Sequence, residues 1–124
     1  MLSGAAGLLF LTLAPPANLL TPAEEKRLEH VKLPEIVAAL QAKEGHRIVD
    51  FGAGEGLYSI ALAKVVGSEG TVYAIDISEH AVKSLRKRVA DGALANITVI
   101  QDTQDDPKLP AGGVDSILLV DTYH

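Results

Sequence analysis

The stretch VDFGAGEG carries glycine at alternate positions, Gly52, Gly54 and Gly56, directly after an apolar run. Glycine lets a backbone turn sharply and lets a ligand approach where a Cβ atom would collide with it. The residues that follow have a helical composition, and the N-terminus of a helix presents unpaired N–H groups to a carboxylate or a phosphate. The spacing therefore predicts a ligand-binding loop, with a tight turn of no further function as the alternative.

A carboxylate follows this loop at an informative distance. Asp76 ends the next β-rich run, TVYAID, twenty residues beyond Gly56. In open α/β sheets a carboxylate at this place accepts hydrogen bonds from ribose hydroxyls, so loop and carboxylate together predict an adenosine-type ligand. A dinucleotide fingerprint would need glycine where Leu57 stands, and no Gly-Lys-Ser/Thr follows for a phosphate-binding loop.

Strands and helices must position these residues, and the apolar spacing predicts that the two alternate. Apolar residues recur with a helical period over 34–44 and again over 56–66. Ser78 is placed to cap a third helix that ends before Gly92. Short apolar runs predict four strands, RIVDF, TVYAID, ITVIQD and VDSILLVD. Strands that alternate with helices imply right-handed crossovers and a parallel sheet, so the predicted class is α/β.

The order of motifs resembles that of the class I S-adenosylmethionine-dependent methyltransferases. Asp50 and the three glycines match the first motif of that family, and YAIDIS looks like the second. VIQDTQDDPKLP is similar to the third motif, and GGVDSILLVDTYH resembles the fourth, with an ending most like a small uncharacterised bacterial branch. The resemblance covers residues 34–124. It implies a three-layer Rossmann-like parallel sheet, a partial form with four strands in the order 3-2-1-4 of a seven-stranded methyltransferase fold.

The resemblance also implies a cofactor, S-adenosylmethionine, and an activity, methyl transfer to an unknown acceptor. Such transfer is an in-line displacement from a sulfonium, so the protein mainly aligns the nucleophile with the methyl carbon. By this resemblance the loop binds the methionine moiety and Asp76 binds the ribose. Ile77 contacts one face of the adenine, and Asp102 and the Thr103 backbone bind the adenine edge. The implied cofactor-binding set is Asp50, Gly52, Ala53, Gly54, Gly56, Asp76, Ile77, Asp102, Thr103 and Asp121.

The acidic residues of this set also have structural interpretations. Asp50, Asp76 and Asp121 lie at strand ends, where a short carboxylate often stabilises a turn. Asp102 lies in the polar segment QDTQDD, for which a solvated loop without a binding role is the alternative. Tyr58, near the glycine loop, is a candidate to border the donor, and packing is the alternative role.

Histidines and basic residues indicate no second site. His30, His46 and His80 lie far apart without ligand spacing, so no metal is predicted. His124 has the side chain of a general base, yet nothing in the sequence orients it, and the catalytic residues stay unknown. The basic residues within 83–88 are typical of a solvated helix face, with RNA or phosphate contact as the alternative.

Composition limits the partners. The 124 residues carry a net charge of −5 and no cysteine, which argues against nucleic acid as a partner and excludes a disulfide framework. We expect a small-molecule acceptor, no membrane span, and a cytoplasmic location because the methyl donor is cytosolic.

The apolar segment 4–20 lies outside the α/β pattern. Its uninterrupted part, Ala5–Ala14, is too short to span a bilayer, and no basic residue precedes it as in a signal peptide. The alternatives are an exported, signal-like remnant and a segment that packs on the domain. The predicted division is an N-terminal apolar segment and linker at 1–30, and the N-terminal part of a methyltransferase domain at 31–124.

The fourth predicted strand contains the run ILLV, the pattern of a strand buried on both faces. The sequence ends three residues after Asp121, so we expect a truncated domain or a homodimer through the exposed edge of this strand. Two other functions stay open: a non-catalytic ligand-binding or interaction module, and a nicotinamide-dependent oxidoreductase half-domain.

Overall fold

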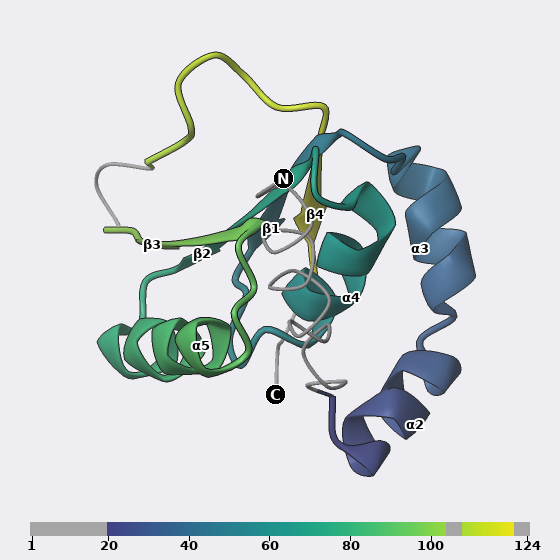
Figure 1. Cartoon of the computed structure of the whole chain (residues 1–124), viewed down its shortest axis with the longest axis horizontal. Coiled ribbons are helices and arrows are strands. Elements are labelled where there is room, and N and C mark those ends of the chain that lie inside the picture. Colours follow the sequence, from purple (N-terminus) through teal and green to yellow (C-terminus); the bar gives the residue numbers. More distant parts are fainter. Residues whose placement is uncertain (1–19, 104–107, 121–124) are drawn as a thin grey trace, which may run out of the picture.

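The computed structural model describes residues 20–103 and 108–120 (Figure 1). Strands and helices alternate along the chain from β1 to β3, as the apolar spacing predicts, and β4 follows β3 with no helix described between them. The elements are α2 (Pro22–His30), α3 (Leu33–Leu40), β1 (Arg47–Phe51), α4 (Leu57–Val66), β2 (Thr71–Asp76), α5 (Glu79–Asp91), β3 (Ile97–Gln101) and β4 (Ser116–Leu119).

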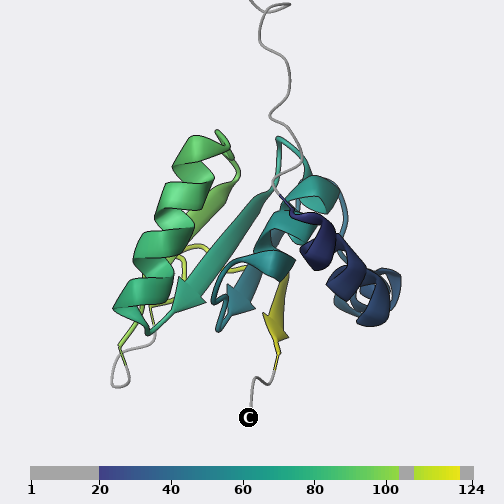
Figure 2. The same ribbon diagram turned by 90° about the horizontal axis from the view of Figure 1, so that it is seen from below.

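The four strands form one parallel sheet in the order β3-β2-β1-β4, which confirms the predicted order (Figure 2). Asp50 of β1 lies beside Ala74 of β2 and Leu118 of β4, and Asp76 of β2 lies beside Gln101 of β3. Because all strands run in the same direction, the segments that follow β1, β2 and β3 leave the sheet at one edge.

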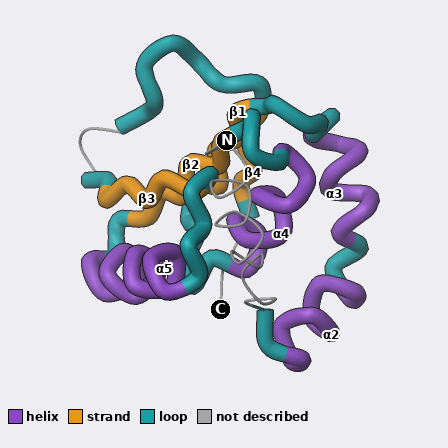
Figure 3. The backbone as a smooth tube through the Cα atoms, in the orientation of Figure 1, coloured by secondary structure: helices purple, strands orange, loops and turns teal. Residues whose placement is uncertain are grey.

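The described helices pack on one face of this sheet. Ile48, Val72 and Ala74 project from β1 and β2 into one apolar cluster with side chains of α2, α3, α4 and α5. The connection from β3 to β4 passes over the other side of the sheet (Figure 3). The second helical layer of a three-layer arrangement is not among the described residues.

The helix ends follow local chemistry. Ser78 caps α5 by accepting a hydrogen bond from the Ala81 N–H, and Gly92 follows its last residue, as predicted. The helix predicted over 34–44 instead ends at Leu40, because Gln41 adopts a left-handed conformation with φ of 52° and closes the last turn.

The segment TPAEEKRLEH forms a capped helix. Thr21 and Glu24 make a reciprocal capping box at the start of α2, in which each side chain accepts from the other residue's N–H. Leu20 and Leu28 are buried in the apolar cluster that contains the sheet. The predicted division at residue 30 stays a prediction, but the residues just before it contribute to the core.

The prediction that the fourth strand is buried on both faces is wrong for the described structure. Side chains of β4 alternate, and Ile117 and Leu119 are 45% and 74% exposed. Leu118 points to the helical face and packs against the core. The apolar run therefore lies at the edge of the described sheet, with only one of its faces covered by the helices.

Candidate functional site

The glycine loop between β1 and α4 is held by the end of β2. Gly52, Gly54 and Gly56 all have positive φ, at 78°, 56° and 89°, which is the conformation that favours glycine. The N–H groups of Gly52 and Ala53 both donate to the carbonyl oxygen of Ile75, at 2.8 and 3.0 Å. The loop therefore has a fixed shape at the carboxyl edge of the sheet.

Gly56 is also closely packed against α5. A Cβ atom at this position would lie 2.4 Å from Cδ1 of Leu85, a buried residue of α5. Gly56 is the N-cap residue of α4 and has no side chain to make a capping hydrogen bond, while the Ser59 N–H in the first turn is bound by the Asp50 carboxylate. The first turn of α4 thus presents backbone N–H groups and the positive dipole end toward the loop.

Asp76 links β2 to the glycine loop and to the start of α5. Its Oδ2 accepts from the Gly54 N–H and its Oδ1 from the Ser78 N–H, both at 2.8 Å. Each carboxylate oxygen has two acceptor positions, so both can still accept from the hydroxyl groups of a ligand. The next residue, Ile77, is 53% exposed and presents an apolar surface beside this carboxylate.

Asp50 lies beneath the loop and is 2% exposed. Ser59, in the first turn of α4, donates its hydroxyl to Asp50 Oδ2 at 2.6 Å. Burial, with a smaller contribution from the nearby charge of Asp76, raises the pKa of Asp50 to about 6 against the lowering effect of the Ser59 hydrogen bonds. Sequence reasoning missed Ser59, and the only local signal was a hydroxyl residue one turn into a helix that follows a buried acid.

Asp102 is brought next to the end of β2. Its backbone N–H donates to the Asp76 carbonyl oxygen at 2.9 Å. Its side chain is 3% exposed, and Oδ1 accepts from the N–H groups of Thr103 and Lys108, both at 2.9 Å. Asp102 is therefore not a solvated loop residue, because its carboxylate holds the start of the connection to β4 in place.

The structure brings most of the predicted set together at one edge of the sheet. The residues that lie there are Asp50, Gly52, Ala53, Gly54, Gly56, Asp76, Ile77, Asp102 and Thr103. Asp121 and His124 lie outside the described residues. Tyr58 is half-buried and packs against the core.

Other candidate residues have separate roles. Nδ1 of His30 lies 2.8 Å from the Lys26 carbonyl oxygen. Within residues 20–103 and 108–120, no group of three or more potential ligands is placed to hold a metal ion. The solvated face predicted for the basic residues within 83–88 is wrong for Arg88, which is largely buried and paired with Glu24.

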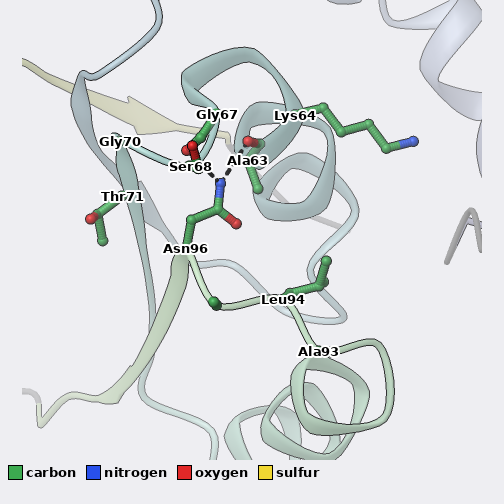
Figure 4. A pocket seen from close by; sticks show the side chains of 10 residues that line it. Ala63, Lys64, Gly67, Ser68, Gly70, Thr71, Ala93, Leu94 and Asn96 are labelled. Atoms are coloured by element: carbon green, nitrogen blue, oxygen red, sulfur yellow. Dashed lines mark hydrogen bonds between the residues drawn. The ribbon is translucent and has the colours of Figure 1, made fainter. Parts of the chain in front are cut away.

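A hollow of about 620 Å³ lies at the opposite end of the strands (Figure 4). It is lined by the end of α4 and by residues that begin β2 and precede β3. The Asn96 side-chain amide donates to the carbonyl oxygens of Ala63 and Gly67, which terminates α4 on one wall. None of the predicted ligand-binding residues lines this hollow.

Known proteins resemble this arrangement. The profile of the family described as "Methyltransferase domain" matches residues 42–124. A SAM-dependent methyltransferase of Aquifex aeolicus has a similar structure, with a TM-score of 0.63 and 32% sequence identity over 79% of this chain and 55% of that one.

Two similar curated proteins are also methyltransferases. Aklanonic acid methyltransferase DauC of Streptomyces sp. is 32% identical over 74 residues, which is 60% of this chain and 34% of the relative. Demethylmenaquinone methyltransferase of Geobacillus kaustophilus is 30% identical over 91 residues, 73% of this chain and 39% of the relative. The chain thus spans well under half the length of these two relatives.

Proposed function

This chain belongs to the methyltransferase domain family, and on that basis we propose that it binds S-adenosylmethionine at the glycine loop and takes part in methyl transfer. The observation that carries the proposal is the contact between Asp76 and the loop. The Asp76 carboxylate accepts hydrogen bonds from the Gly54 N–H and from the Ser78 N–H before α5, and its oxygens can accept further hydrogen bonds from a ligand. A ligand that contacts the loop therefore lies within reach of an acceptor for its ribose.

The charges of the site suit this donor. S-adenosylmethionine carries a sulfonium, an ammonium group and a carboxylate. Asp50 and Asp76 supply negative charge for the two cationic groups. The N-terminal turn of α4, whose N-cap residue Gly56 has no side chain, supplies backbone N–H groups for the carboxylate.

The adenine is assigned to the far side of Asp76. Ile77 offers an exposed apolar surface for one face of the ring. Asp102 and the Thr103 backbone lie next in the direction of β3. A hydrogen bond from the Asp102 N–H to the Asp76 carbonyl oxygen keeps them close to the Asp76 carboxylate, which is assigned to the ribose. Asp121 completes the proposed donor set. Methyl transfer itself needs alignment more than an acid or base, so we assign no catalytic residue.

We propose a small molecule as the acceptor and the cytoplasm as the location. The names of the two curated relatives above, which act on aklanonic acid and demethylmenaquinone, support the first part. The net charge of −5 disfavours nucleic acid as a partner. Within the described part of the chain, no helix has the length and apolar character needed to cross a membrane.

We further propose that two copies of the chain pair through β4. Among the described strands, β4 pairs only with β1, and its outer residues Ile117 and Leu119 are exposed. An apolar edge strand is a template for pairing with a second chain.

Calorimetric titration of the full chain with S-adenosylhomocysteine tests the donor site. We expect saturable binding that Asp76→Ala weakens by roughly tenfold to a hundredfold, because hydrogen bonds to a charged group contribute about 1.5–3 kcal/mol. Asp91→Ala removes an equal charge from an exposed position of α5 and is the matched control, which should bind like the parent chain.

The same titration with NAD separates the proposed donor from a dinucleotide, and we expect no NAD binding. Absence of S-adenosylhomocysteine binding by the folded parent chain, or equal affinity of the Asp76→Ala and Asp91→Ala variants, would contradict the proposal.

A further inference from the structure

We propose that Arg88 is a positioning residue for the donor site, holding the glycine loop through the Glu55 carbonyl group while Glu24 of α2 holds Arg88. The inference deepens the proposed function and rests on it, because it concerns how the same loop keeps its shape. It adds α2, which precedes the residues 42–124 matched by the family profile, to the machinery of the site.

The guanidinium of Arg88 bridges two segments that are distant in sequence. Nη1 donates to the Glu55 carbonyl oxygen at 3.2 Å and to Glu24 Oε1 at 2.9 Å. Nη2 donates to Glu24 Oε2 at 2.7 Å. Glu55 lies between Gly54 and Gly56, so this bond grips the part of the loop that is closest to α4.

Glu24 is itself held in place. Its Oε2 also accepts from the Thr21 N–H at 2.9 Å, as part of the capping box of α2. The side chains of Arg88 and Glu24 are 22% and 11% exposed, so water screens the pair only weakly. The hydrogen bond from Arg88 is the largest cause that lowers the pKa of Glu24 to about 2, so Glu24 keeps its charge in acidic solution where a free glutamate is protonated.

The contacts of α5 with the loop occur on consecutive turns of that helix. Leu85 packs where a Cβ atom of residue 56 would lie, and Arg88, three residues later, binds the preceding carbonyl group. The first contact limits how closely the loop approaches α5, and the second limits how far it moves away. A buried ion pair is weak evidence for stability, but one that is shared with a loop carbonyl restricts geometry.

Nuclear magnetic resonance of the ligand-free chain, combined with titration, tests this inference. Loss of the bond to the Glu55 carbonyl should shift the carbonyl ¹³C signal of Glu55 and the amide ¹⁵N signal of Gly56. We expect Arg88→Met to shift both signals and to raise the dissociation constant for S-adenosylhomocysteine roughly five- to tenfold, a modest coupling between two sites. Glu24→Gln should act in the same direction with a smaller effect.

The control is the neighbouring ion pair of the same helix. Lys87 pairs with Asp91 on the exposed face of α5, so Lys87→Met removes a cation without touching the loop, and both signals and affinity should stay as in the parent. Arg88→Lys keeps the charge and should recover part of the affinity. If Arg88→Met fails to fold, Arg88→Lys and Glu24→Gln carry the test.

The outcomes separate this inference from the donor site. Unchanged Glu55 and Gly56 signals in the folded variants, or affinities within twofold of a parent chain that binds, would overturn the positioning role. A parent chain that does not bind S-adenosylhomocysteine contradicts the proposed function instead, and the signals of the ligand-free variants still decide whether Arg88 holds the loop.

Discussion

The carboxyl edge of β1 and β2 and the outer side of β4 belong to one sheet, yet they are built in opposite ways. At the first, backbone N–H groups and carboxylates satisfy each other, as where Asp76 accepts from Gly54 and Ser78. At the second, Ile117 and Leu119 are apolar and exposed. Both regions come from short apolar strands, so composition alone does not distinguish them.

The difference teaches where this part of the chain keeps its geometry. The donor edge is over-determined, because the glycine loop is tied to the end of β2 and to α5 by several contacts. The side of β4 that faces away from the helices has no such ties among the described residues. Substitutions at the donor edge should therefore change both stability and binding, whereas substitutions on the outer side of β4 should change neither much within a single chain.

At the donor edge, the largest effect is expected at Gly56. Gly56→Ala places a methyl group 2.4 Å from the Leu85 side chain at a φ of 89°. Crowding of a packed core and a strained backbone together should lower the free energy of unfolding by about 3 kcal/mol, and donor binding should be lost because the loop must move. Urea denaturation with S-adenosylhomocysteine titration measures both.

Gly45→Ala is the matched control for this substitution. Gly45 has nearly the same φ, 84°, but nothing lies within 4 Å of an added Cβ atom. Only the backbone strain remains, so we expect a loss of about 1 kcal/mol and unchanged donor binding. Equal losses at the two positions would show that Leu85 adapts and that the close packing of the loop is not required.

Sequence patterns predicted the parts of this molecule that depend on local chemistry. The four strands and the loop followed from apolar runs and from glycines at alternate positions, whereas the strand order followed from the family resemblance. The partner of Arg88 did not, because Glu24 lies 64 residues away and only the fold brings the two together. Exposure of Leu119 was also hidden, since it depends on which element lies beside β4 and not on the run ILLV itself.

Asp50 should show the next largest effect, with opposite signs for stability and binding. Its pKa is raised from 3.8 to about 6, so the folded state holds the proton more tightly than the unfolded state. Stability of the parent chain should therefore fall as the pH rises from about 4 to about 6, by roughly 3 kcal/mol at most. Asp50→Asn keeps an acceptor for Ser59 and should be about 2 kcal/mol more stable at pH 8.

Donor binding should respond to Asp50 in the opposite direction, because loss of its charge should weaken affinity. A cationic donor favours the charged form of Asp50, so affinity of the parent chain should decrease as the pH falls below about 6. The asparagine variant should bind weakly with little dependence on pH. Unfolding curves and titrations with the cationic donor between pH 4 and 8 check both, and a stability difference between the parent chain and Asp50→Asn that stays constant from pH 4 to 6 would contradict the raised pKa.

The smallest effect on stability is expected on the outer side of β4. Leu119 is 74% exposed, so Leu119→Lys should change the free energy of unfolding of a single chain by less than about 0.5 kcal/mol. Leu118, the preceding residue, packs against the core, and Leu118→Ser should cost about 2 kcal/mol.

If two copies pair through β4, sedimentation equilibrium should show a dimer that Leu119→Lys converts to a monomer, because the new charges oppose each other across the paired edge. A parent chain that is monomeric at every concentration tested would leave the donor edge unaffected and remove the proposed pairing.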